Sequence, residues 1–190
     1  MIQKRFRPAA AIFSMMMMMA TLISSCSDKA DDPKKNEENE LITTVHLHLT
    51  SSSGAMTMAT WKDLTPDDAA GRTVDTLFLE DSTLYTGMIE LSDQSKSPAV
   101  DISDEVKTEG ADHLFIYKQT PSATPSWFAV VRTDKDANNR EIGLAYTVQT
   151  NGTKGVTGIN VILKHQPDVK DGTETPGDVD VDVVIPVKIR

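Results

Sequence analysis

Four histidines are the residues of this sequence best suited to bind a metal ion. Two of them lie in the segment Val45-His46-Leu47-His48-Leu49. Alternate side chains of a β-strand point to the same face, so His46 and His48 are expected to project from one side while the apolar residues fill the other. Such a pair can bind one ion such as Zn²⁺ or Cu²⁺. The alternative is two solvent-facing histidines opposite a core face.

His113 and His165 form a second candidate metal site. Each lies where the apolar face of an expected strand meets a loop. Glu109 and Asp112 flank His113, and two aspartates follow His165. If the two strand ends are neighbours, these groups can assemble a site of imidazoles and carboxylates for Zn²⁺ or another divalent ion. The alternative is two hydrogen-bonded histidines at the rim of the core.

The acidic and aromatic residues are less specific. Asp134, Asp136 and Asn138 have the spacing of a calcium loop, but Asn139 and Ala145 stand where that loop requires Gly and Glu, so a hairpin turn is expected. Trp61 and Trp127 are candidates for sugar stacking or for the core. One acidic stretch has the composition of a solvated face, with divalent-cation binding as the alternative: Asp168, Asp171, Glu174, Asp178, Asp180 and Asp182.

No motif for catalysis accompanies these residues. The sequence has no G-x-S-x-G elbow, no Gly-rich phosphate loop and no H-E-x-x-H pair. We therefore expect a protein that is not an enzyme and has no assigned catalytic residue or organic cofactor.

The first 25 residues have the features of a signal peptide. Lys4, Arg5 and Arg7 precede an uncharged, mostly apolar run of about 15 residues, shorter than the roughly 20 that span a bilayer. The run ends in Leu22-Ile23-Ser24-Ser25-Cys26, which resembles the lipobox of bacterial lipoproteins. This resemblance implies cleavage before Cys26 and attachment of acyl chains such as palmitate to it. The protein would then be anchored to a membrane through Cys26.

Residues 26–40 follow as a charged tether, and residues 41–190 are expected to form a single domain. Removal of residues 1–25 takes away three basic residues and no acidic one, so the net charge goes from −9 to −12. Nucleic acid is therefore not expected as a partner, because phosphate binding needs clustered Lys and Arg.

Hydrophobic periodicity in residues 41–190 predicts an all-β fold. Apolar residues alternate with polar ones near the C-terminus, from Val179 to Ile189, and Pro186 indicates an edge or bulged strand there. The acidic segment from Asp101, as N-cap, to Gly110 predicts one short helix. Together these signals predict an immunoglobulin-like antiparallel β-sandwich of about nine strands, near 41–50, 55–62, 73–80, 83–91, 112–119, 126–133, 141–150, 156–165 and 179–189.

Several short segments are similar to those of Bacteroidetes-type outer-membrane lipoproteins: the lipobox, Glu40-Leu41-Ile42-Thr43-Thr44, Gly110 to Phe115, Asp134 to Asn138, and Leu163 to Pro167 with the acidic tail strand. The resemblance implies an accessory lipoprotein of a TonB-dependent receptor system, on the periplasmic or the cell-surface side of the outer membrane. The expected function is binding in nutrient or metal uptake. The alternative is a structural or adhesion lipoprotein that binds a protein or glycan surface.

Overall fold

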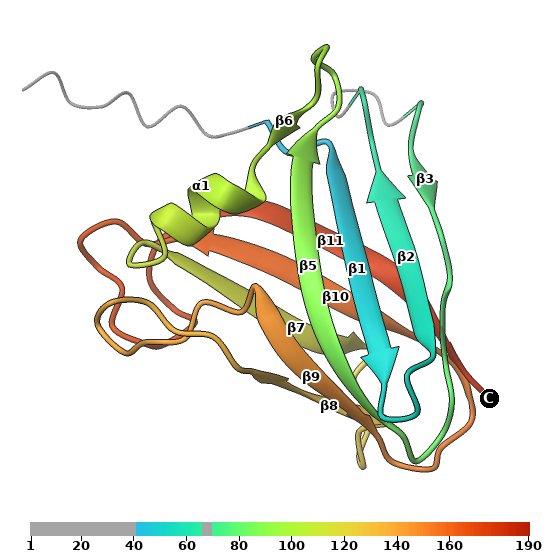
Figure 1. Cartoon of the computed structure of the whole chain (residues 1–190). Helices are drawn as coiled ribbons and strands as arrows, with labels where there is room; N and C mark the ends of the chain where they lie inside the picture. The colour runs from blue at the N-terminus through green and yellow to red at the C-terminus, as the bar shows by residue number, and fades with distance from the viewer. Residues whose placement is uncertain (1–40, 66–69) are drawn as a thin grey trace, which may run out of the picture. The chain divides into compact units, whose positions relative to one another are not determined.

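The computed structural model describes residues 41–65 and 70–190, all within one compact unit, Glu38–Arg190 (Figure 1). The expected signal peptide, Cys26 and the tether lie outside the described residues. Every buried hydrophobic side chain described lies between Ile42 and Ile189. The unit therefore contains a complete core of its own.

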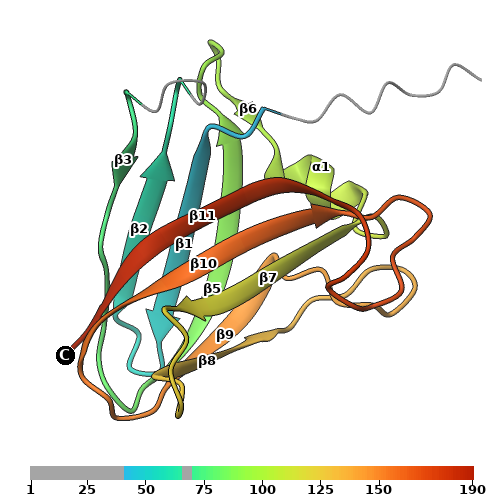
Figure 2. The same cartoon turned by 180° about the vertical axis from the view of Figure 1, so that it is seen from behind.

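Two β-sheets pack face to face around this core (Figures 1 and 2). Sheet A has the strand order β3-β2-β1-β5-β9-β8, and β6 pairs with β5. Its strands are β1 (Thr44–Ser51), β2 (Met56–Lys62), β3 (Thr73–Val74), β5 (Leu84–Asp93), β6 (Val100–Asp101), β8 (Phe128–Arg132) and β9 (Ala145–Thr150). Sheet B has the order β4-β11-β10-β7, with strands β4 (Leu77–Leu79), β7 (His113–Thr120), β10 (Gly155–His165) and β11 (Asp178–Ile189). The predicted all-β sandwich is confirmed.

The strand count and pairing differ from the prediction at two places. The segment expected as one strand, 73–80, divides into β3, which pairs with β2 in sheet A, and β4, which pairs with β11 in sheet B. Asp75 makes the division, because its amide donates to the Thr60 carbonyl and its carboxylate accepts from the Thr60 amide. The β4–β11 pairing is parallel, so the sandwich is not wholly antiparallel. With β6 as a further short strand, the described chain has eleven strands and not nine.

The C-terminal strand β11 has the expected alternation from Val181 onward. Pro186 pairs with Gly158 of β10, while the β4 partners begin only at Val187, so β11 has a free edge at the proline. A register shift beside Leu163 turns Val179 outward, and its side chain is exposed although the sequence predicts it to be buried.

The predicted short helix is present as α1 (Ser103–Thr108). Its N-cap is Ile102 and not Asp101, and no side chain caps it. The Asp101 carboxylate instead accepts from the Ser103 amide at 2.8 Å, and Ser103 Oγ accepts from the Leu91 amide at 2.7 Å. These contacts hold the helix beside the C-terminal end of β5.

A glycine lets the largest core side chain lie flat against sheet A. Gly87 on β5 pairs with Tyr146 on β9, whose side chain is fully buried. A Cβ at Gly87 would lie 2.4 Å from the Tyr146 ring. The ring therefore occupies the space that any other residue at this position would need.

We expect Gly87→Ala to lower the free energy of unfolding by about 1–3 kcal/mol, because the buried ring has to move. Urea denaturation measures this change. Gly71→Ala is the matched control, since a Cβ there meets its nearest neighbour, Thr65 Oγ1, at 3.4 Å. Equal stability of the two variants would contradict the packing described for Tyr146.

Candidate functional site

A pocket of about 860 Å³ lies between β5, α1 and the loop that joins β8 to β9. Small-ligand sites typically have volumes of about 300–1,000 Å³. Strands β1 and β5 contribute His46, Met88 and Glu90, the segment at α1 contributes Asp104 and Lys107, and the loop contributes residues 134–137. Both signs of charge therefore meet in one hollow beside the sandwich.

The β8–β9 loop, which forms one wall of the pocket, is a hairpin stabilised by hydrogen bonds to Asp134. Its two carboxylate oxygens accept from the amides of Gly143 and Leu144, at 2.8 and 3.1 Å. Asp136 Oδ1 accepts from the amides of Asn138 and Arg140, at 2.8 and 2.9 Å. These carboxylates hold the turn through backbone amides, as in the expected Asp- and Asn-rich hairpin.

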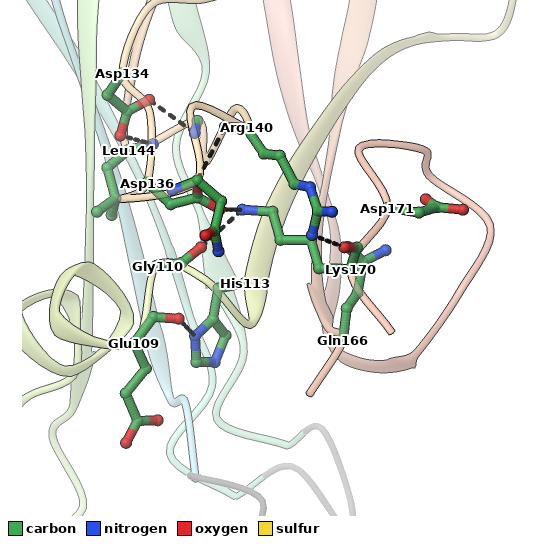
Figure 3. A network of polar contacts seen from close by, with 12 residues as sticks. Glu109, Gly110, His113, Asp134, Asp136, Arg140, Leu144, Gln166, Lys170 and Asp171 are labelled. Atoms are coloured by element: carbon green, nitrogen blue, oxygen red, sulfur yellow. Dashed lines mark hydrogen bonds and ion pairs between the residues drawn. The ribbon is translucent and has the colours of Figure 1, made fainter. Parts of the chain in front are cut away.

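A buried ion pair connects this hairpin to the acidic loop that follows β10. Lys170 Nζ lies 2.9 Å from Asp136 Oδ2, and each side chain is only 1% exposed. The same ammonium donates to the Gly110 carbonyl at 2.7 Å, and Arg140 donates to the Lys170 carbonyl (Figure 3). Burial alone would raise the pKa of Asp136, but the Arg140 amide and the Lys170 ammonium together lower it. Three loops distant in the sequence are thus joined at one point.

Gln166 organises the rest of the acidic loop. It is completely buried, and its side-chain amide donates to the carbonyls of Thr173 and Pro176. Its backbone amide donates to the Asp112 carbonyl at 2.6 Å. Three acidic residues of the stretch have separate local partners. Asp171 accepts from Thr173, Glu174 pairs with Lys118, and Asp182 accepts from Asn160. These three carboxylates are not gathered around one point.

The structure brings His113 and His165 together, as the sequence analysis required. They are paired residues of β7 and β10, and their rings stack at 4.8 Å between centroids and 10° between planes. His113 Nδ1 lies 3.0 Å from the Glu109 carbonyl, so it carries the proton and Nε2 is the remaining acceptor. The backbone carbonyl of Glu109 accepts from His113 Nδ1, and the backbone carbonyl of Asp112 accepts from the Gln166 backbone amide.

Burial changes the pKa of His113 and that of the nearby Asp180. Burial lowers the pKa of His113 below its ordinary value of 6.5, although the Glu109 carbonyl opposes the shift. Burial also raises the pKa of Asp180, despite the nearby imidazoles. In residues 41–65 and 70–190, no three His, Cys, Asp or Glu side chains form a group that could hold a metal ion. Metal binding by His113, His165, Glu109 and Asp112 stays a prediction.

His46 and His48 project from the outer face of sheet A, while Val45, Leu47 and Leu49 are buried on the other side, as predicted. Their ring centroids are 6.0 Å apart. His46 Nδ1 is 3.0 Å from Thr60 Oγ1, and His48 Nε2 is 3.3 Å from Glu90 Oε2. Both side chains are partly exposed, and His46 also lines the pocket.

The two tryptophans do not form a common platform. Trp61 lies on β2, where the Arg72 guanidinium is above its ring. Trp127 precedes β8, near the opposite edge of sheet A, and its ring packs against Gly155. Both are partly buried against the core. This packing agrees with the core position that was the alternative to sugar stacking.

Sequence reasoning missed two components of this region. Lys170 is a lone lysine in an acidic stretch, and nothing local in the sequence marks it as buried. The methionines Met56, Met58 and Met88 are the second component. Met56 and Met58 alternate on a predicted strand, so the sequence does place their side chains on one face.

Comparison with known proteins gave no relative: no protein family, no curated protein and no solved structure matches this chain. Among the described residues, the single helix is too short and too polar to cross a membrane.

We expect Lys170→Met to lower the free energy of unfolding by about 3–5 kcal/mol at pH 7, because it leaves the buried Asp136 carboxylate without its cation. Adding Asp136→Asn should recover part of this loss, since the amide oxygen still accepts from the turn. Urea denaturation of the two variants measures both effects.

The control for this pair is Lys118→Met, which removes the exposed ion pair with Glu174 and should change stability by at most about 0.5 kcal/mol. If Lys170→Met cost no more than this control, the ion pair would not be the link between the loops.

His113 should make the fold sensitive to mild acid. Its pKa is lower in the folded chain than in the unfolded chain, so the unfolded chain binds more protons in the interval below pH 6.5. Stability is therefore complete above pH 6.5 and falls as the pH drops toward the lowered pKa. His113→Gln should reduce this slope in urea denaturation between pH 7.5 and 5. An unchanged slope would show that His113 titrates alike in both states.

Proposed function

We propose that this chain is a lipid-anchored binding protein of the outer membrane, which captures a nutrient or metal ion and delivers it to an uptake system. The similarity of Leu22 to Cys26 to a lipobox supports the anchor. A TonB-dependent receptor is the partner that the sequence resemblance favours, with the domain on the periplasmic or the cell-surface side.

The observation that carries the binding function is the pocket beside β5. Its size fits a small ligand, and its walls come from a packed strand and from loops locked by Lys170 and Asp136. A site held in this way needs little ordering when the ligand arrives. Two hydroxyls that line the pocket make structural contacts with the backbone: Ser103 contacts Leu91, and Thr108 donates to the Asp104 carbonyl.

Acylation of Cys26 is the first test of this proposal. Cells that express the full chain are grown with an alkyne-bearing palmitate. The wild type should carry the label, and so should Ser25→Ala, which keeps a small residue before the cleavage site. Cys26→Ala should carry no label and should leave the detergent phase in a Triton X-114 partition. Label on Cys26→Ala, or no label on the wild type, would contradict a lipid anchor.

Ligand binding is tested by blocking the pocket. Ala111 lines it, whereas Ala129 is exposed on β8 and does not. Thermal unfolding of residues 27–190 is followed with Zn²⁺, haem and oligosaccharides as probes. At a hundredfold excess over its Kd, a bound probe stabilises by about 2.7 kcal/mol.

The proposal predicts that at least one probe stabilises the wild type and Ala129→Trp but not Ala111→Trp. Equal stabilisation of all three proteins would place binding outside the pocket. Binding to a protein or glycan surface that is indifferent to Ala111→Trp would instead support the adhesion function.

A further inference from the structure

All three methionines that follow the expected signal peptide lie on the outer face of sheet A. The sequence has nine methionines, of which six are Met1 and residues 15–19 and three are Met56, Met58 and Met88. These three are 85%, 55% and 58% exposed. Methionine is among the residues most often buried, so three exposed thioethers on one face need an explanation other than packing.

The strand register places two of these methionines on either side of a histidine. His48 on β1 pairs with Met58 on β2 and with Met88 on β5. Directly opposite residues of antiparallel strands have Cα atoms about 4.5–5.5 Å apart and side chains on the same face. A row of thioether, imidazole and thioether therefore crosses the neighbouring strands β2, β1 and β5 of sheet A, which lie in front in Figure 1.

Neighbouring groups complete the surroundings of this row. Glu90 Oε2 contacts His48 Nε2 at 3.3 Å, an arrangement in which Nδ1 is the nitrogen that would bind an ion. The His46 ring is 6.0 Å from the His48 ring. Met88 and His46 also line the pocket, so the row and the pocket are continuous.

We propose that Met58, His48 and Met88 form a binding site for a soft monovalent metal ion of the Cu(I) class, with His46 as an adjacent imidazole. Thioether and imidazole ligands select Cu(I), whereas carboxylates and carbonyls select Ca²⁺ and Mg²⁺. Methionine has three rotatable bonds, so both sulfur atoms can turn toward an ion above His48. This inference names the ligand class of the proposed binding protein and rests on that function.

The test is a competition for Cu(I). Residues 27–190, which contain the complete unit Glu38–Arg190, are titrated anaerobically with Cu(I) in the presence of ascorbate and a chromophoric Cu(I) chelator. The wild type should take one equivalent from the chelator. The double variant Met58→Leu/Met88→Leu should lose affinity by at least about 100-fold, and His48→Gln by at least about 10-fold.

Leucine has nearly the volume of methionine and is equally apolar, so the double variant removes sulfur without removing the apolar surface. Met56→Leu is the matched control, because Met56 lies on the same face but pairs with Thr50, outside the row. It should keep its affinity within about threefold. Circular dichroism checks that each variant is folded, which is expected because all the altered side chains are on the surface of the sheet.

Two results would overturn the inference: a wild type that leaves Cu(I) with the chelator, or a double variant that binds Cu(I) as tightly as the wild type. Neither result bears on the pocket test with Ala111→Trp, so a failure of the metal site and a failure of the binding function are distinguishable.

Discussion

The register of β1 between β2 and β5 is the constraint on which the candidate site depends. Side chains alternate along a strand, so a slip of one residue would exchange the two faces of all its positions. Val45, Leu47 and Leu49 fix the register because they are buried against sheet B. His48 is then necessarily outside, opposite Met58 and Met88. The core thus determines which chemical groups the outer face displays.

The loops at one end of the sandwich depend on a different interaction. Lys170 and Asp136 are both withdrawn from water, and the ion pair is further satisfied by the Gly110 carbonyl and two turn amides. Buried charges are tolerated only when they are matched in this way. The pair connects the end of α1, the β8–β9 hairpin and the acidic loop, so it sets the position of one wall of the pocket. Sheet register and buried charge together define the hollow beside β5.

The sequence predicted those features that follow from local alternation. The nine expected strand regions all contain strands, the two histidines of Val45 to Leu49 share an outer face, and His113 lies beside His165. Features that depend on distant partners could not be predicted. The division of 73–80 between the sheets depends on Asp75 meeting Thr60, and Val179 turns outward because of a shift at Leu163. The burial of Lys170 depends on a carboxylate 34 positions away.

The methionine resonances of the chain test the proposed metal site most directly. Residues 27–190 contain only three methionines, so ¹³C-methyl labelling without an added methionine gives three signals. Silver(I), a redox-inert substitute for Cu(I), should shift the signals of Met58 and Met88 at one equivalent and leave that of Met56 in place. Three unmoved signals, or a shift of Met56 as large as the others, would contradict a site formed by the row across β2, β1 and β5.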